Sequence, residues 1–169
     1  MMKKAVIVLA MHGAPPADFP QPELTEFMSL HGKIGHGATD EPLRFRYTEL
    51  EKKMRAWPRN AQNDRFFIGS EELAERLRQE TGLEIILGFN EFCAPSIDEA
   101  LDLATATEAE TIVVVTPMMT RGGGHSETEI PAAINRARTR HPGKRIIYAW
   151  PFAAEDVARF LTLHLKKFL

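Results

Sequence analysis

Three residues of types that bind transition metals each follow an apolar, Val- and Ile-rich segment. His12 follows segment 5–10, Glu91 follows 83–89, and His125 lies shortly after 111–117. Two imidazoles and a carboxylate suit a borderline divalent ion such as Co²⁺, Fe²⁺ or Ni²⁺. Neutral imidazoles also accept protons near pH 7, so the same three side chains suit general base chemistry.

Alternating strands and helices are predicted to position these residues. Four apolar segments without polar alternation are typical of strands buried on both faces: 5–10, 83–89, 111–117 and 145–150. Amphipathic patterns predict helices at 70–82, with Ser70 as N-cap, at 95–109, at 129–143 and at 154–169. This alternation predicts a flavodoxin-like, doubly wound α/β fold with a four-stranded parallel sheet of order 2-1-3-4 and helices on both faces.

The predicted topology places the three residues at one edge of the sheet. Ligands of open parallel sheets bind beyond the carboxyl ends of the strands, where strand order reverses, which here lies between strands 1 and 3. We therefore expect His12, Glu91 and His125 to meet there. Taken singly, each has a simpler interpretation, as a hydrogen-bonded loop residue, a helix cap or a turn residue respectively.

Three consecutive glycines precede His125 in the stretch RGGGH, 121–125. Glycine is costly to order, so we expect them to permit a tight turn, close approach of a flat ligand, and backbone N–H groups aimed at anionic substituents. No Gly-Lys-Ser/Thr follows, and no Gly-x-Gly-x-x-Gly occurs, which disfavours nucleotide binding.

The region 15–69 interrupts the alternation as an insertion after strand 1. Segments 22–32 and 41–58 are predicted helices, joined by a glycine-rich loop at 31–40. The insertion is interpreted either as a helical lid over the site or as a stabilising flap without ligand contact. His31 and His36 lie in the expected loop and are interpreted as solvated.

Composition narrows the function classes. The 169 residues fit a single domain, 1–169, and a net charge of −2 provides no general basic field for nucleic acid. One cysteine, Cys93, excludes an internal disulfide and is expected to pack as a small apolar group, while Ser96 is expected to cap a helix. No apolar segment is long enough to cross a membrane, and the N-terminal segment is interpreted as a buried strand rather than a signal peptide, which predicts a cytoplasmic protein.

Three stretches resemble the small CbiX-type sirohydrochlorin cobaltochelatases and ferrochelatases of the class II chelatase superfamily. They are VIVLAMHG, FNEFCAPSIDEAL and VVVTPMMTRGGGHSETEIPAAI…RHPG. The resemblance implies that His12 and His125 bind the metal and that Glu91 works with them in catalysis. This sequence departs from the family pattern in having Ala14 where Ser is usual, an extra glycine after Arg121, and the 15–69 insertion.

The expected reaction is insertion of Co²⁺ or Fe²⁺, with Ni²⁺ as a further candidate, into sirohydrochlorin or a related tetrapyrrole, without an organic cofactor. The macrocycle is expected to contact a set of glycine-loop and neighbouring residues: Gly13, Met118, Arg121, Gly122, Gly123 and Gly124, with Arg44 or Arg46 reaching from the insertion. Larger chelatases have two such halves, so a homodimer is expected. The alternative function is a non-catalytic tetrapyrrole or metal carrier. Phe160, Leu163 and other apolar residues of the last helix fit either a dimer contact or a buried terminal helix.

Overall fold

The structure, a computed structural model, describes residues 5–35, 37 and 39–169. Strands β1 (Ala5–Met11), β2 (Glu84–Phe89), β3 (Thr111–Val115) and β4 (Arg145–Tyr148) form one parallel sheet in the order β2-β1-β3-β4. This confirms the predicted fold class and strand order. Strands of a parallel sheet are buried on both faces and are therefore rich in Val and Ile, which is the pattern from which these four were predicted.

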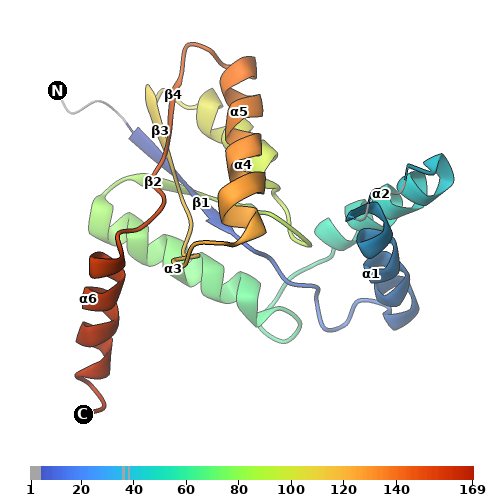
Figure 1. The fold of residues 1–169 in the computed structure, drawn as a ribbon, viewed down its shortest axis with the longest axis horizontal. Coiled ribbons are helices and arrows are strands. Elements are labelled where there is room, and N and C mark those ends of the chain that lie inside the picture. The colour runs from blue at the N-terminus through green and yellow to red at the C-terminus, as the bar shows by residue number, and fades with distance from the viewer. Residues whose placement is uncertain (1–4, 36, 38) are drawn as a thin grey trace.

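Helices cover both faces of the sheet (Figure 1). Helices α4 (Ile97–Ala106) and α5 (Ile130–Arg140) pack on one face, and α3 (Arg65–Thr81) packs on the other. A single π-helical turn, η1 (His125–Glu129), leads directly into α5. The residue before α4 is the predicted cap: Ser96 forms a reciprocal capping box with Glu99.

Helix α3 begins five residues earlier than predicted. Asp64 is its N-cap, and its side chain accepts a hydrogen bond from the Phe67 N–H at 2.8 Å. Ser70, the expected N-cap, lies inside the helix, where its hydroxyl donates to the Phe66 carbonyl at 2.7 Å. The expectation was wrong because both residue types cap helices and only the folded chain decides between them. Gly82 ends the helix with a φ of 67°, as expected.

The insertion folds into an antiparallel helical hairpin of α1 (Gln21–Gly35) and α2 (Glu41–Arg55), which stands beside the sheet-containing part of the molecule (Figure 1). Helix α1 is longer than expected, so the predicted loop at 31–40 is wrong for its first five residues, among them His31. His36 lies outside the described residues. Phe27, Leu30, Leu50 and Met54 are buried and tie the hairpin to the apolar layer that α3 also covers.

Helix α6 (Ala154–Leu165) projects away from the sheet (Figure 1). None of its described residues is buried, so the interpretation of its apolar pattern as a buried terminal helix is wrong for this chain. Within the described ranges, no helix has the length and apolar character needed to cross a membrane.

Candidate metal centre

The carboxyl edge of the sheet brings His12, Glu91 and His125 together, as the topology predicted. One ligand atom from each residue lies within 4.8 Å of the others. The loops after β1 and β2 are joined by the backbone, because the Glu91 N–H donates to the His12 carbonyl and the Asn90 N–H to the Met11 carbonyl, both at 2.9 Å. The η1 turn supplies His125 from the other side, so three segments that are distant in sequence form one cluster.

The two imidazoles meet at their Nε2 atoms, with their ring planes nearly perpendicular to each other. The Nδ1 of His12 lies 2.8 Å from the Gly13 carbonyl, and the Nδ1 of His125 lies 2.8 Å from the Glu129 carboxylate. A carbonyl oxygen and an ionised carboxylate can only accept hydrogen bonds. With Glu129 ionised, the Nδ1 of each histidine must therefore be the donor. Each Nε2 then has a free lone pair, and the two Nε2 atoms lie 3.1 Å apart. Two lone pairs at this distance repel unless a cation, either a shared proton or a metal ion, lies between them.

The separation of these nitrogens suits a shared metal ion. Two ligands about 2.1 Å from one ion lie about 3.0–3.4 Å apart when they subtend angles between octahedral and tetrahedral values. The Nε2–Nε2 distance of 3.1 Å falls in this interval. His12 is exposed, whereas Glu91 and His125 are partly buried, so the cluster is open to solvent on one side.

Glu129 is a functional candidate that the sequence reasoning missed. It pairs with His125 across one turn of helix, and this i, i+4 spacing is visible in the sequence as H-S-E-T-E. Metal-binding histidines commonly donate their second N–H to a carboxylate, which fixes the tautomer and raises the basicity of the ligating nitrogen. This contact makes Glu129 a candidate positioning residue for His125.

Replacing Glu129 with Gln is expected to weaken Co²⁺ binding about 10- to 100-fold, because the loss of such outer partners usually has this effect. Isothermal titration of the purified protein with Co²⁺ measures the change. Glu127→Gln is the matched control, since its carboxylate bonds the Gly122 N–H rather than a histidine. Equal affinities in the two variants would contradict the role of Glu129.

Gly13 allows the loops after β1 and β2 to pack against each other. Its φ of 100° is a conformation that residues with a Cβ rarely adopt, and an added Cβ would lie 1.9 Å from the Glu91 carbonyl oxygen. The resemblance placed Gly13 in the substrate-binding set, which stays a prediction. The structure adds a separate reason for glycine at this position.

Two arginines at the end of the hairpin hold the loop that contains Glu91. Arg55 donates to the carbonyls of Asn90 and Cys93 at 2.9 and 2.6 Å. Arg59 donates to the Phe92 carbonyl at 2.6 Å and pairs with Asp64 in a buried ion pair. The insertion therefore helps to hold the loop that carries one member of the cluster. Sequence reasoning missed both arginines because the segments they bridge are more than thirty residues apart.

In the glycine stretch, only Gly122 has a left-handed backbone, with a φ of 92°. Its N–H donates to the Glu127 carboxylate at 3.0 Å, and this bond, aided by Arg121, lowers the pKa of Glu127. That N–H would reach a ligand only after Glu127 moves aside. Arg121 is 71% exposed, and its guanidinium lies 5.7 Å from the centre of the Trp150 ring. Roles of Arg121, Gly122, Gly123, Gly124 and Met118 toward a substrate remain predictions.

Other sequence candidates have structural roles. Cys93 is fully buried, as expected. Arg46 is already engaged by Glu26 of α1 through two hydrogen bonds of 2.8 and 2.9 Å, so its charge is compensated within the hairpin. His31 was interpreted as solvated, and this was wrong in part: its side chain is 42% exposed, but its Nε2 lies 3.4 Å from a carboxylate oxygen of Glu91. The helix extends further than predicted and turns His31 toward the site.

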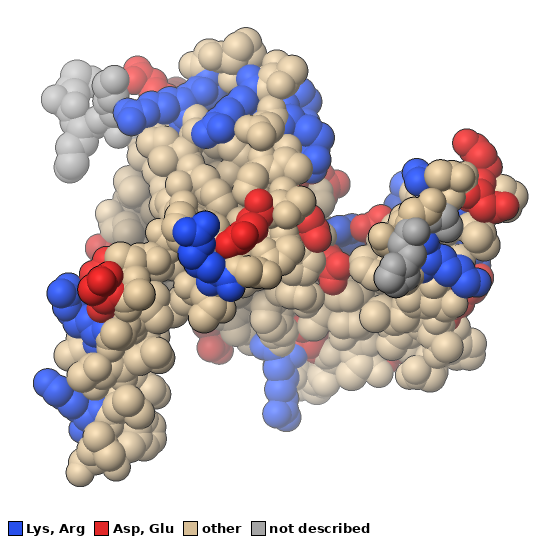
Figure 2. All heavy atoms as spheres, viewed as in Figure 1, with Lys and Arg blue, Asp and Glu red and all other residues tan. Residues whose placement is uncertain are grey.

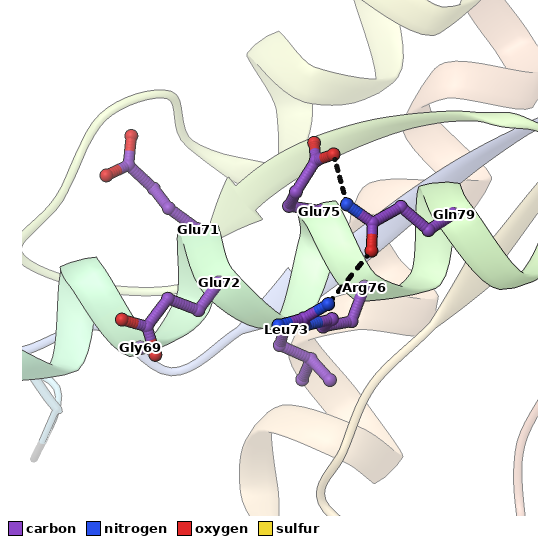
Figure 3. Close-up of a pocket in the computed structure, with 7 residues that line it drawn as sticks. All are labelled: Gly69, Glu71, Glu72, Leu73, Glu75, Arg76 and Gln79. Atoms are coloured by element: carbon purple, nitrogen blue, oxygen red, sulfur yellow. Dashed lines mark hydrogen bonds between the residues drawn. The ribbon is translucent and has the colours of Figure 1, made fainter.

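A cavity of about 300 Å³ lies between the hairpin and the metal cluster. Its lining includes His31 and Tyr47 from the hairpin and Glu91 and Glu129 from the sheet side. Acidic side chains gather where the two parts of the molecule meet (Figure 2). A second concavity, on α3, is shown in Figure 3; its lining residues, from Gly69 to Gln79, all belong to that helix, so it is the outer surface of one element.

The fold and the site define a class: a flavodoxin-like α/β protein with a His–Glu–His cluster that could hold a metal ion at the carboxyl edge of its sheet. The CbiX family model matches residues 63–162, more than half of the sequence, and the chain belongs to this family. The matched region contains Glu91, Glu129 and His125. His12 and the helical hairpin lie outside it.

Three known proteins are similar to this chain in sequence or in structure. A sirohydrochlorin cobaltochelatase of Priestia megaterium is 31% identical over 98 residues, which are 57% of this chain and 30% of that protein; the match thus spans about a third of the relative's length. A solved CbiX protein of Marinobacter aquaeolei VT8, described with cobalamin (vitamin B12) biosynthesis, has the same fold: its TM-score is 0.52 at 18% identity, over 96% of this chain and 98% of that one. The sirohydrochlorin chelatase SirB of Bacillus subtilis subspecies spizizenii, solved with cobalt, aligns with a TM-score of 0.44 at 19% identity, over 88% of this chain and 43% of that one.

Proposed function

We propose that this protein inserts Co²⁺ or Fe²⁺ into sirohydrochlorin or a closely related tetrapyrrole, as a step of cobalamin- or sirohaem-type biosynthesis in the cytoplasm. The observation that supports this most directly is the pair of imidazole Nε2 atoms 3.1 Å apart beside Glu91. Family membership and the name of the Priestia relative support the same reaction class.

The reaction exchanges two protons for a metal ion, and the metal is a substrate. Two pyrrole N–H bonds break, the ion leaves its protein ligands for the macrocycle nitrogens, and two protons go to bases of the protein and then to water. Once the ion has left, His12 and His125 are free to accept protons on the nitrogens that held it. Few and partly exposed ligands favour release, since a closed four-ligand site retains its ion. No organic cofactor is required.

The macrocycle would lie over the exposed His12, with its carboxylates toward Arg121 and the glycine stretch. Arg121 is suited to a carboxylate because its planar guanidinium is always charged and can bond it through two N–H groups. Met118 and Gly13 are proposed to face the ring. The inserted hairpin lines the cavity beside the cluster, which supports the interpretation of the insertion as a lid.

Anaerobic mixing of the protein with sirohydrochlorin and Co²⁺ or Fe²⁺ tests the proposal. The rate of the absorption change on metalation is expected to be well above the rate measured without protein. If the tetrapyrrole spectrum shifts on binding while metalation stays at the uncatalysed rate, the protein is a carrier and the chelatase proposal is wrong. Uroporphyrin, which lacks the reduced rings of sirohydrochlorin, is a control for macrocycle selectivity.

We further propose that the protein is a homodimer. Ile7, Val113 and Ile147 occupy paired positions on the α3 side of the sheet, yet each remains partly exposed because α3 covers the β2 edge. Parallel sheets normally have both faces covered. The apolar side of α6 is also exposed, including Phe160 at 54% and Leu163 at 59%. A second copy of the chain, contributing its own α6, would cover it.

Light scattering after size exclusion is expected to give the mass of two chains. The double substitution Phe160→Glu and Leu163→Glu is expected to give monomers, since two buried charges without partners oppose association. Arg159→Glu, on the same helix, is the control for added charge. A single-chain mass for the unmodified protein at high concentration would contradict the dimer.

A further inference from the structure

His31 extends from the inserted hairpin to the metal cluster. It lies in α1, outside the segment that matches the family model, and its Nε2 is 3.4 Å from Glu91 Oε1. A neutral N–H···O hydrogen bond has donor and acceptor about 2.7–3.2 Å apart, so this contact is too long for a good one. It matches instead the spacing of about 3.4 Å between two ligands of a tetrahedral ion.

The ring of His31 is held in this orientation by its neighbours. Its Nδ1 lies 3.2 Å from the Tyr47 hydroxyl, and burial raises the pKa of Tyr47 to about 12, so that the hydroxyl keeps its proton and can still accept a hydrogen bond through its oxygen. Phe27 packs against Tyr47 with ring centres 4.9 Å apart, and against Phe92 at 6.0 Å. Because Phe92 follows Glu91 directly, this aromatic cluster fixes His31 relative to the carboxylate. Metal-binding histidines commonly ligate the ion through one ring nitrogen and donate a hydrogen bond from the other, which here would be Nδ1 toward the Tyr47 hydroxyl.

Glu91 is the carboxylate that the two sets of ligands share. One set is His12, Glu91 and His125, and the other is His31 with Glu91. The cavity between hairpin and sheet is lined by His31 and by Glu51, Glu91 and Glu129, so its carboxylates favour a divalent cation over an anion.

We propose that His31 is a metal ligand, which with Glu91 holds the incoming divalent ion on the hairpin side before the ion passes to His12 and His125. Its role in the reaction rests on the proposed chelatase function, whereas its ability to bind metal rests on the contact geometry alone. The hairpin is then part of the metal-delivery route as well as a cover for the site.

Co²⁺ binding without any tetrapyrrole tests the ligand assignment. In proton NMR spectra of the Co²⁺-loaded protein, exchangeable imidazole signals with large paramagnetic shifts are expected for His31 as well as His12 and His125. His31→Ala should remove the His31 signal, keep the others and lower the affinity of the hairpin-side site for Co²⁺ about tenfold. The control is His141→Ala, because that imidazole binds Asp102 on α4, outside the cluster. Identical shifted signals and affinity in His31→Ala and the unmodified protein would overturn the proposal.

The insertion kinetics separate the two proposals. We expect His31→Ala to raise the KM for Co²⁺ about tenfold and to change kcat little, because the variant lacks an early binding step and retains the final site. Insertion with unchanged metal KM and unchanged spectra would overturn the role of His31 and leave the chelatase function standing. Loss of a shifted signal in a protein that never inserts metal would keep His31 as a ligand and overturn the proposed function. Circular dichroism and thermal unfolding of the variant check that the hairpin still folds.

Discussion

His125→Ala is expected to lower kcat/KM for metal insertion about 10²- to 10⁴-fold, the range found when a positioned acid–base group is removed. The substitution removes one of the two facing nitrogens and leaves His12 with no imidazole partner 3.1 Å away. It also leaves Glu129 without its 2.8 Å contact. The ion therefore loses one ligand, and the departing proton loses one base. Initial rates of metalation, measured anaerobically with sirohydrochlorin and Co²⁺, give the size of the loss.

The matched control for His125→Ala is again His141→Ala, expected to stay within about twofold of the unmodified rate because an exposed histidine outside the site contributes little. Co²⁺ titration of His125→Ala should show weakened binding in parallel. An activity loss below about threefold, with the variant correctly folded, would show that the facing imidazoles do not hold the reacting ion.

Gly13→Ala is expected to lower the free energy of unfolding by more than about 4 kcal/mol, a value that only a few mechanisms produce. Two of them act at this position. The left-handed backbone, with a φ of 100°, strains any residue with a Cβ, and the new Cβ would lie 1.9 Å from the Glu91 carbonyl oxygen. That oxygen belongs to backbone that Arg55 and Arg59 hold in place, so relaxation would displace Glu91 from His12.

Urea unfolding followed by circular dichroism measures the effect of Gly13→Ala. Gly124→Ala is the control: its φ is −57°, and among the described residues nothing lies within 4 Å of the added Cβ. We expect that variant to be as stable as the unmodified protein or slightly more stable, because alanine loses less backbone entropy. If Gly13→Ala unfolded at the same urea concentration as Gly124→Ala, the packing of the loops after β1 and β2 would not constrain the site.

The sequence alone predicted the sheet, its strand order and the meeting of His12, Glu91 and His125. Buried parallel strands leave a strong local pattern of β-branched residues, and the rules of right-handed crossover allow few strand orders. Once the order is known, residues that directly follow neighbouring strands must lie at one edge, whatever their separation in sequence. Ser96 and Gly82 were likewise predictable, because a helix cap depends on residues within one turn.

Only the tertiary structure decided what surrounds that cluster. The direction of the hairpin depends on how Phe27, Tyr47 and Phe92 pack, and this packing turns His31 toward Glu91. The carbonyls that Arg55 and Arg59 bind have no side-chain signature, since every residue offers one. The exposure of α6 likewise depends on which faces remain uncovered after folding. These features arise from contacts between segments far apart along the chain, whose energies no local pattern of residues encodes.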